Sequence, residues 1–254
     1  MESSNTEQEI SLEELLSLAD QGDSQAQITL GLLYFEGKHI EQDLQTSVDW
    51  FIKAANQNNA LAQSFLGTLY SDGVHFPQNY QEATKWYLLA AEQGNEMAQY
   101  NLALLYDEGT KIKQNYQEAA KWYHRAAEQG NPRAQRNLAG MYLNGDGVKQ
   151  DDKEAVKWFQ LAAVQGDSSA LLNLGYMFSE GRGVKQDYLE AERLYQMAAE
   201  QGEIGAYQNL GVMYINGQGV EQDILLAKEY FKKACDHGYQ ASCDAYMQII
   251  DAGF

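Results

Sequence analysis

This chain of 254 residues has few basic side chains, only two cysteines and no long apolar run. Its 18 Lys and Arg residues are outnumbered by 36 Asp and Glu residues, which gives a formal net charge of −18. Binding to a nucleic-acid backbone, or to a membrane surface rich in anionic lipid, requires a basic footprint. Both kinds of partner are therefore disfavoured. The acidity otherwise fits charged side chains on solvated faces, where they favour solubility.

The absence of about 18 consecutive apolar residues predicts no membrane insertion. Residues 1–10 form a polar, acidic segment without the basic and apolar regions of a secretory signal. We therefore expect a periplasmic or secreted protein if a signal peptide has been removed from this chain, and a cytoplasmic protein otherwise.

Motifs that carry catalytic chemistry are also missing. The chain has no serine in a nucleophile elbow, no phosphate-binding loop with a lysine and no His-Glu-x-x-His motif. The four histidines are scattered at positions 39, 75, 124 and 237, and loop polarity explains His39 and His75. We predict that the protein is not an enzyme and binds no cofactor and no metal ion.

What the chain does contain is one pattern repeated six times with a period of 36 residues. A period of 20–50 residues is typical of a solenoid, whose stacked units make an extended surface suited to holding a partner. Three registers show the period most clearly: Trp50, Trp86, Trp122, Trp158, Leu194 and Tyr230; Tyr34, Tyr70, Tyr106, Tyr142, Phe178 and Tyr214; and Gln42, Gln78, Gln114, Gln150, Gln186 and Gln222.

Each repeat is predicted to be a helical hairpin, and residues 131–166 give the clearest copy. Asn131 is expected to cap a first helix, helix A, with Pro132 at its first position. The glycines of segment 144–147 end helix A because they allow a positive φ. The tryptophan of the repeat is expected to fill the core rather than a ligand cage.

The second helix of the hairpin, helix B, is expected to begin at Asp151 and to end at Gly166. Glu154 follows Asp151 by three residues, which is a capping-box spacing. The same spacing recurs at Asn79/Glu82, Asn115/Glu118 and Asp187/Glu190. The next helix A starts one residue after the glycine, so neighbouring helices are predicted to be antiparallel.

The ends of the array depart from the pattern, as capping units do. Residues 11–22 are expected to form an N-terminal capping helix and residues 239–254 a C-terminal one. Residues 23–238 hold the six repeats, and residues 1–10 form a polar tail. The predicted fold class is all-α.

The pattern resembles the Sel-1-like repeat family, a relative of the tetratricopeptide repeat. The resemblance implies a right-handed α/α superhelix that acts as a bacterial adaptor or scaffold, without implying a particular partner. Three copies depart from the pattern, because His39, His75 and Lys111 replace the second loop glycine. The residues that carry the resemblance in the clearest copy are Ala134, Leu138, Tyr142, Gly145, Gly147, Val148, Asp151, Ala155, Trp158, Phe159, Ala162, Ala163 and Gly166.

Cys235 and Cys243 are the only cysteines, eight residues apart across the last turn between helix B and the following helix. Such a hairpin brings two α-carbons within disulfide range. The spacing is similar to that of the cysteine-rich branch of the same family, which implies a disulfide and an oxidising compartment. The alternative is a pair of small buried thiols. A structural zinc site needs about four ligands, and His237 would add only one to the two cysteines.

The face of helix A opposite its core stripe is the predicted binding surface. An asparagine ladder runs along it, and an amide that both donates and accepts suits the backbone of an extended peptide. Packing between hairpins is the alternative role. Tyrosine and arginine are typical of binding hot spots, and two arginines suit a carboxylate. The predicted residues of this concave face are Asn101, Asn137, Asn173, Asn209, Tyr100, Arg133, Arg136 and Tyr176.

The sequence therefore predicts a monomeric, non-catalytic scaffold that binds a protein or peptide in its concave groove. Two alternatives stay open. The first is an immunity-type inhibitor that neutralises a cognate toxin or effector by capping it. The second is a hydrolase of a lactam or cell-wall substrate, although the chain lacks the Ser-x-x-Lys motif that acylation would use.

Overall fold

The computed structural model describes residues 10–74 and 76–254, and these residues form fourteen α-helices and no strand. The predicted polar tail falls almost wholly outside the described residues, as does His75. The helices are α1 (Leu12–Asp20), α2 (Ser24–Glu36), α3 (Leu44–Asn56), α4 (Ala60–Asp72), α5 (Tyr80–Glu92), α6 (Glu96–Glu108), α7 (Tyr116–Glu128), α8 (Pro132–Asn144), α9 (Asp152–Val164), α10 (Ser168–Glu180), α11 (Tyr188–Glu200), α12 (Ile204–Asn216), α13 (Ile224–Asp236) and α14 (Gln240–Asp251).

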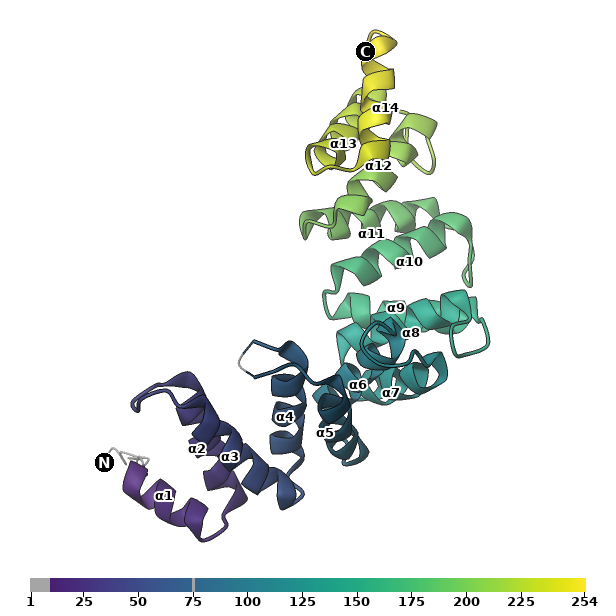
Figure 1. Ribbon diagram of the computed structural model, residues 1–254. Helices are drawn as coiled ribbons and strands as arrows, with labels where there is room; N and C mark the ends of the chain where they lie inside the picture. Colours follow the sequence, from purple (N-terminus) through teal and green to yellow (C-terminus); the bar gives the residue numbers. More distant parts are fainter. Residues whose placement is uncertain (1–9, 75) are drawn as a thin grey trace, which may run out of the picture. The chain divides into compact units, whose positions relative to one another are not determined.

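The chain divides into two compact units, residues 1–115 and residues 116–254. The first holds α1–α6 and the second α7–α14, and in each the successive helices pack side by side as hairpins (Figure 1). The even-numbered helices α2 to α12 correspond to helix A, and the odd-numbered helices α3 to α13 to helix B. The predicted all-α class and the stacking of helical hairpins are confirmed.

Helix starts and ends follow the local signals in the sequence. Asn131 caps α8 by accepting a hydrogen bond from the Ala134 amide at 2.8 Å, with Pro132 in the first turn. The helices that correspond to helix A, α2 to α12 in even numbers, end at a glycine in the left-handed region, for example Gly145 with a φ of 83°. Gly166, with a φ of 86°, follows the end of α9 in the same region. A residue with a Cβ is strained at such angles, so the glycines end the helices where predicted.

The capping boxes form only in part. Asp151 caps α9 through the amides of Lys153 and Glu154, at 3.0 and 3.2 Å. The Glu154 carboxylate pairs with Lys157 at 3.1 Å instead of returning to the capping residue. The Asp151 amide donates to the Tyr142 carbonyl at 2.9 Å. The reciprocal half of the predicted box at Asp151 is wrong, because that amide is already bonded and a lysine lies one turn away.

The conserved spacing of the third register has a structural cause in the loop between helices A and B. In every repeat the glutamine side chain donates to a backbone carbonyl seven residues earlier, from Gln42 to Phe35 at 2.7 Å through Gln222 to Ile215 at 2.7 Å. The accepting carbonyl belongs to the last turn of helix A, where backbone oxygens lack partners within the helix. Each glutamine thereby closes the loop of its own hairpin.

His39 and Lys111, which replace the second loop glycine, have different backbone conformations. His39 keeps the left-handed backbone of the missing glycine, with a φ of 66° beside 69° for Gly147. Lys111 is not among the residues with positive φ, so the loop of the third repeat takes another path. The backbone of this loop in the third repeat therefore differs from that in the first repeat and in the repeats that keep the glycine.

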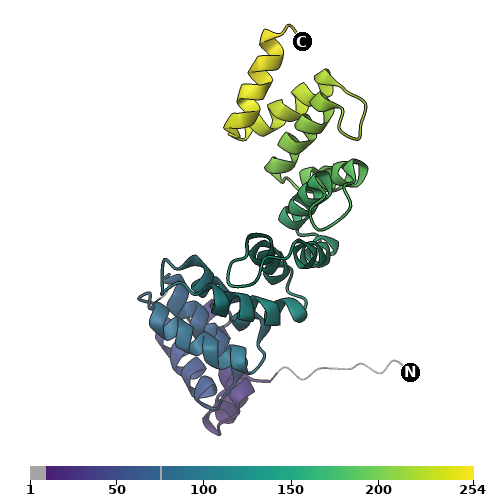
Figure 2. The same cartoon turned by 90° about the vertical axis from the view of Figure 1, so that its right-hand side faces the viewer.

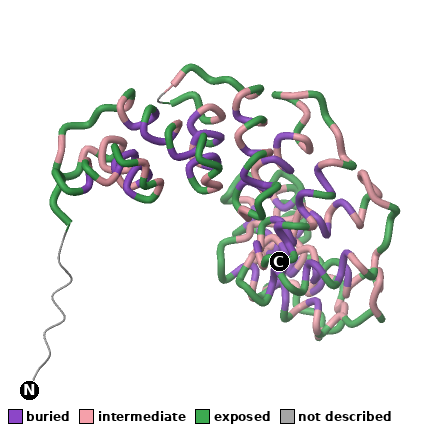
Figure 3. Tube along the Cα trace, turned by 90° about the horizontal axis from the view of Figure 1, so that it is seen from below, coloured by how far each residue is buried: buried purple, intermediate pink, exposed green. Residues whose placement is uncertain are grey.

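The core lies along the lines where helices meet their neighbours, and the buried residues follow those lines along the tube (Figure 3). Trp50, Trp122 and Trp158 are buried as predicted, while Trp86 is half-buried. Small residues allow the helices of a hairpin to approach closely. A Cβ placed on Gly67 would meet the Tyr87 ring at 2.4 Å.

Two helices lie outside the six predicted repeats. Helix α1 precedes the first hairpin and packs on α2. Helix α14 packs on α13 at the C-terminal end (Figure 2). Their role as caps of the array stays a prediction. None of the helices in residues 10–74 and 76–254 combines the length and the apolar character that crossing a membrane requires.

Candidate functional site

The predicted binding residues fall into both units of the structure. Tyr100 and Asn101 lie half-buried on α6 in the first unit. The other six lie on α8, α10 and α12 in the second unit. Tyr176 and Asn209 line one hollow in the second unit, and they are the two predicted residues that this hollow brings together.

The asparagine ladder takes different roles from rung to rung. Asn137 donates to the Tyr123 hydroxyl at 3.0 Å, and Asn101 lies close enough to the Tyr87 hydroxyl to act against the rise in its pKa that burial causes. At the next rung Phe159 stands in place of the tyrosine, and the Asn173 amide turns to the Ser169 carbonyl of its own helix at 2.7 Å. Asn137 therefore makes the contact between neighbouring hairpins that the packing alternative predicts.

Asn209 differs from the other three. Among the described residues its side-chain amide has no hydrogen-bonding partner, although Tyr195 stands at the position of Tyr123. The Tyr195 hydroxyl instead lies 3.4 Å from Ser179 Oγ. Both hydrogen-bonding groups of the Asn209 amide are thus available to an incoming ligand.

The hollow that contains Asn209 has a volume of about 180 Å³ and opens between α10 and α12. Tyr176 stands on its rim with 41% of its surface exposed. Burial raises the pKa of Tyr195 to about 12, with the Glu180 carboxylate contributing, so the phenol stays protonated near neutral pH. The lining is Tyr176, Ser179, Glu180, Tyr188, Tyr195, Asn209, Val212, Met213 and Gln218.

The two predicted arginines are not equivalent. Arg133 is exposed on the first turn of α8. Arg136 is half-buried and pairs with Asp167 at 3.0 Å, and Asp167 in turn caps α10 through the Ala170 amide at 2.8 Å. Arg136 thus links the fourth repeat to the start of the fifth, and a partner carboxylate would have to compete with Asp167 for it.

Sequence analysis missed a second glutamine register, which lies deep between the helices. Gln27, Gln63, Gln99 and Gln135 are buried, and each donates to the carbonyl eight residues earlier at 2.9 to 3.1 Å. A glutamine from the end of the next helix B donates in turn to three of these side chains. The 36-residue spacing of the buried glutamines is the signal that would have revealed them.

This deep ladder is interrupted in the second unit. Leu171 stands where the fifth glutamine would be, and Tyr207 stands at the sixth position. The Tyr207 hydroxyl still donates to the carbonyl eight residues earlier, Ala199, at 2.9 Å. Leu171 has no polar side-chain group to do so.

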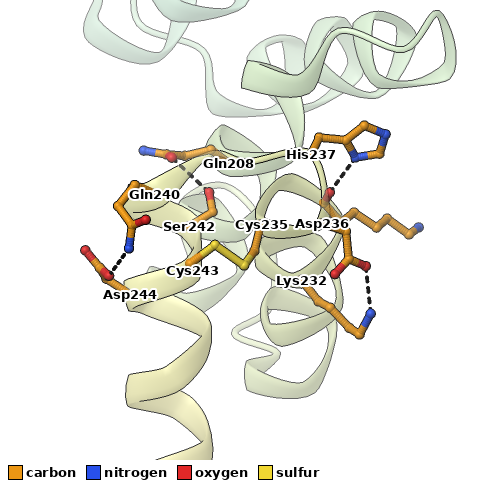
Figure 4. Close-up of a disulfide and its surroundings, with 10 residues drawn as sticks. Gln208, Lys232, Cys235, Asp236, His237, Gln240, Ser242, Cys243 and Asp244 are labelled. Atoms are coloured by element: carbon orange, nitrogen blue, oxygen red, sulfur yellow. Dashed lines mark hydrogen bonds and ion pairs between the residues drawn. A yellow bond between two sulfur atoms is a disulfide. The ribbon is translucent and has the colours of Figure 1, made fainter.

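The cysteine pair lies at the C-terminal end of the second unit (Figure 4). The two sulfur atoms of Cys235 and Cys243 are 2.02 Å apart, the distance of a disulfide, and the α-carbons are 4.6 Å apart. The bond joins the last turn of α13 to the first turn of α14. His237 Nδ1 lies 2.8 Å from the Lys233 carbonyl oxygen. Within residues 10–74 and 76–254, no three His, Cys, Asp or Glu side chains are grouped to hold a metal ion.

Comparison with known protein families matches six consecutive copies of the Sel1 repeat, and the matches run without a gap over most of the chain. The chain belongs to the Sel1 repeat family. The matched residues are 24–59, 60–95, 96–131, 132–167, 168–203 and 204–239. The resemblance seen in the sequence is confirmed. No curated protein matches this chain in a sequence comparison.

Solved structures with the same fold include c5321, described as a protective antigen present in uropathogenic Escherichia coli strains displaying an SLR fold. It is 35% identical with a TM-score of 0.86 over 96% of this chain and 52% of that chain, so this chain spans about half of its length. A Sel1 repeat protein from Oxalobacter formigenes is 34% identical, with a TM-score of 0.73 over 88% of this chain and 89% of that one. Helicobacter pylori cysteine rich protein B is 25% identical, with a TM-score of 0.40 over 50% and 90% of the two chains.

Proposed function

We propose that this Sel1 repeat protein is a non-catalytic scaffold that holds an extended segment of a protein partner against α8, α10 and α12 of its second unit. The proposed centre of binding is the hollow between α10 and α12. The observation that carries the proposal is that Tyr176 and Asn209, both selected from the sequence, line this hollow together. An exposed tyrosine ring beside a free amide offers one apolar and one hydrogen-bonding contact, the combination typical of peptide-binding surfaces.

The family supports this proposal because stacked helical repeats make extended surfaces whose variable positions contact partners. The positions that build the fold are already engaged in packing and loop closure. Glu180 and Gln218 add acceptors and donors at the rim of the hollow. The proposal has two further parts: that the scaffold acts as an adaptor, and that it resides in an oxidising compartment. The disulfide-spaced cysteines support an oxidising compartment.

The proposal is tested by photo-crosslinking from Val212, which lines the hollow, in cells that express the intact chain. A partner captured from Val212 is expected to be lost when Tyr176→Ala and Asn209→Ala are combined. The matched control is Tyr239→Ala, because Tyr239 is 44% exposed at the start of α14 and lies outside the hollow. Retention of the partner by the double variant would refute this site.

Each of the two alternatives raised by the sequence has its own test. A captured partner whose own activity is silenced at equimolar amounts would replace the adaptor role with an immunity-type role. Turnover of a fluorogenic lactam by the purified chain would contradict the non-catalytic proposal.

A further inference from the structure

The hollow between α10 and α12 carries one charge in its lining, and that charge is negative. Three tyrosines stand in its walls, Tyr176, Tyr188 and Tyr195. Glu180, the last residue of α10, is the one charged residue of the lining, and it is exposed. Among the described residues, no lysine, arginine or histidine lines the hollow. A carboxylate beside aromatic rings is a setting that favours a cation.

In the first three repeats, the acidic side chain at the position of Glu180 has a partner within its own loop. The fourth and sixth repeats hold asparagine there. The first and third repeats use a lysine of the loop, so the acid at the end of helix A is part of an ion pair. The partners are Lys38 for Glu36 at 2.8 Å, the Val74 amide for Asp72 at 3.0 Å, and Lys111 for Glu108 at 2.8 Å.

Glu180 lacks such a partner because the cation of its loop is engaged elsewhere. Arg182 stands two residues after Glu180, as Lys38 stands after Glu36. The Arg182 guanidinium bonds both carboxylate oxygens of Asp152 instead, with nitrogen–oxygen distances of 2.7 and 3.1 Å. Within residues 10–74 and 76–254, the Glu180 carboxylate forms no ion pair and no hydrogen bond. Its charge is therefore available to a ligand of the hollow.

The third repeat shows how a cation is held at this position. The Lys111 ammonium lies 2.8 Å from Glu108 and 5.5 Å from the centre of the Tyr80 ring, so it meets both a carboxylate and an aromatic face. In the hollow, the Glu180 carboxylate lies close enough to Tyr195 to contribute to the raised pKa of that phenol. The hollow thus offers a carboxylate and an aromatic ring near each other, and a cation is the group that would complete the arrangement.

We infer that the hollow takes a basic side chain of the partner segment, an inference that rests on the proposed function. The Glu180 carboxylate receives the cationic head in charge-assisted hydrogen bonds, and the tyrosine rings contact its flank. The Asn209 amide bonds the neighbouring backbone of the segment. An acidic side chain is repelled at the same place. The net charge of −18 also favours the approach of a basic segment.

The test compares two short, extended alanine–valine peptides that differ in one central side chain, which is arginine or its neutral isostere citrulline. Binding to the intact chain is followed by NMR titration of the Val212 backbone amide signal, because Val212 lines the hollow. The arginine peptide is expected to bind about threefold to tenfold more tightly, the range of an exposed charge-assisted contact. Added salt is expected to reduce this difference, because exposed ion pairs are screened.

The variant that isolates the charge is Glu180→Gln. It is expected to remove the preference for arginine and to leave the affinity for the citrulline peptide unchanged. The matched control is Glu36→Gln, which removes the same charge at the same position of the repeat in the first unit. Thermal melts check that both variants fold. A preference that survives Glu180→Gln, or one that falls equally in both variants, overturns the inference.

The double variant Tyr176→Ala with Asn209→Ala separates failure of this inference from failure of the proposed function. Equal binding of both peptides, lost in the double variant, would keep the hollow as a peptide site and overturn the basic preference alone. Equal binding of both peptides that the double variant retains would refute the site itself. Absence of binding by the arginine peptide up to about 10 mM also overturns the inference.

Discussion

The first and second units are built from the same repeat but differ in charge and in how their variable positions are used. Residues 1–115 hold 5 basic and 17 acidic side chains, and residues 116–254 hold 13 and 19, including all five arginines. In the first unit the deep ladder is complete, at Gln27, Gln63 and Gln99. In the second it ends after Gln135, and Leu171 stands at the next position. The two units therefore share one repeat, but the deep glutamine ladder is complete only in the first.

The largest expected effect tests whether the tryptophan register is equally important in both units. Trp122, 2% exposed, and Trp50, 7% exposed, hold the same position in the repeat. Trp122→Ala and Trp50→Ala are each expected to lower the free energy of unfolding by about 3–5 kcal/mol, through lost burial and the cavity left behind. Urea denaturation measures both. A loss below about 1 kcal/mol for Trp122→Ala would show that this register does not support the core.

A smaller effect of opposite sign is expected at two helical glycines. A Cβ on Gly67, in the first unit, meets the Tyr87 ring at 2.4 Å, whereas a Cβ on Gly140, in the second, has no atom within 4 Å. Gly67→Ala is expected to destabilise the chain by about 1–3 kcal/mol through overpacking. Gly140→Ala is expected to stabilise it by about 0.5–1 kcal/mol because alanine favours the helix. Thermal melts of the two variants measure both effects. A stabilising Gly67→Ala would contradict the close approach of α4 and α5.

The deep ladder can be broken in the first unit and repaired in the second. Gln63→Leu removes the bond to the Ala55 carbonyl at 3.1 Å and the bond from Gln93 at 2.6 Å. We expect a loss of about 1–2 kcal/mol, because buried polar groups lose their partners. Leu171→Gln introduces the missing amide and is expected to change stability by less than about 1 kcal/mol. Denaturation midpoints of both variants provide the measurement, and an unchanged midpoint for Gln63→Leu would count against the ladder.

The smallest effect concerns alkaline pH and the second unit. Burial raises the pKa of Tyr195, and a hydrogen bond to Glu192 raises that of Tyr214, each from 10.0 to about 12. Since the folded state prefers the protonated phenols, their stabilising contribution is complete below pH 10 and is lost as the pH rises toward 12. Absorbance titration at alkaline pH is expected to show late ionisation that moves earlier in urea. In Tyr195→Phe the late component should shrink, and an unaltered titration curve would argue against the assignment to Tyr195.

Sequence reasoning predicted the hairpins because their signals are local. Asn131, Pro132 and the loop glycines each act on the backbone within a few residues, so a single chain reveals them. The role of Asn137 depends on whether a tyrosine or a phenylalanine lies across the hairpin, and Arg136 depends on Asp167, 31 residues away. Such pairings need the packing of neighbouring repeats. The hollow that Tyr176 and Asn209 line could not be predicted as a site, because its walls come from α10, α11 and α12 and meet only after folding.

The glutamine that closes each loop has a consequence for how the gene for such a chain can change. Its hydrogen bond joins residues seven apart, as from Gln78 to Ser71, so a hairpin carries the means of closing its own loop. Removing residues 60–95 as one block, or copying them, leaves every remaining loop with its own glutamine. Length can therefore vary by whole blocks without new turns having to be invented, as expected for arrays that depend on nearest neighbours.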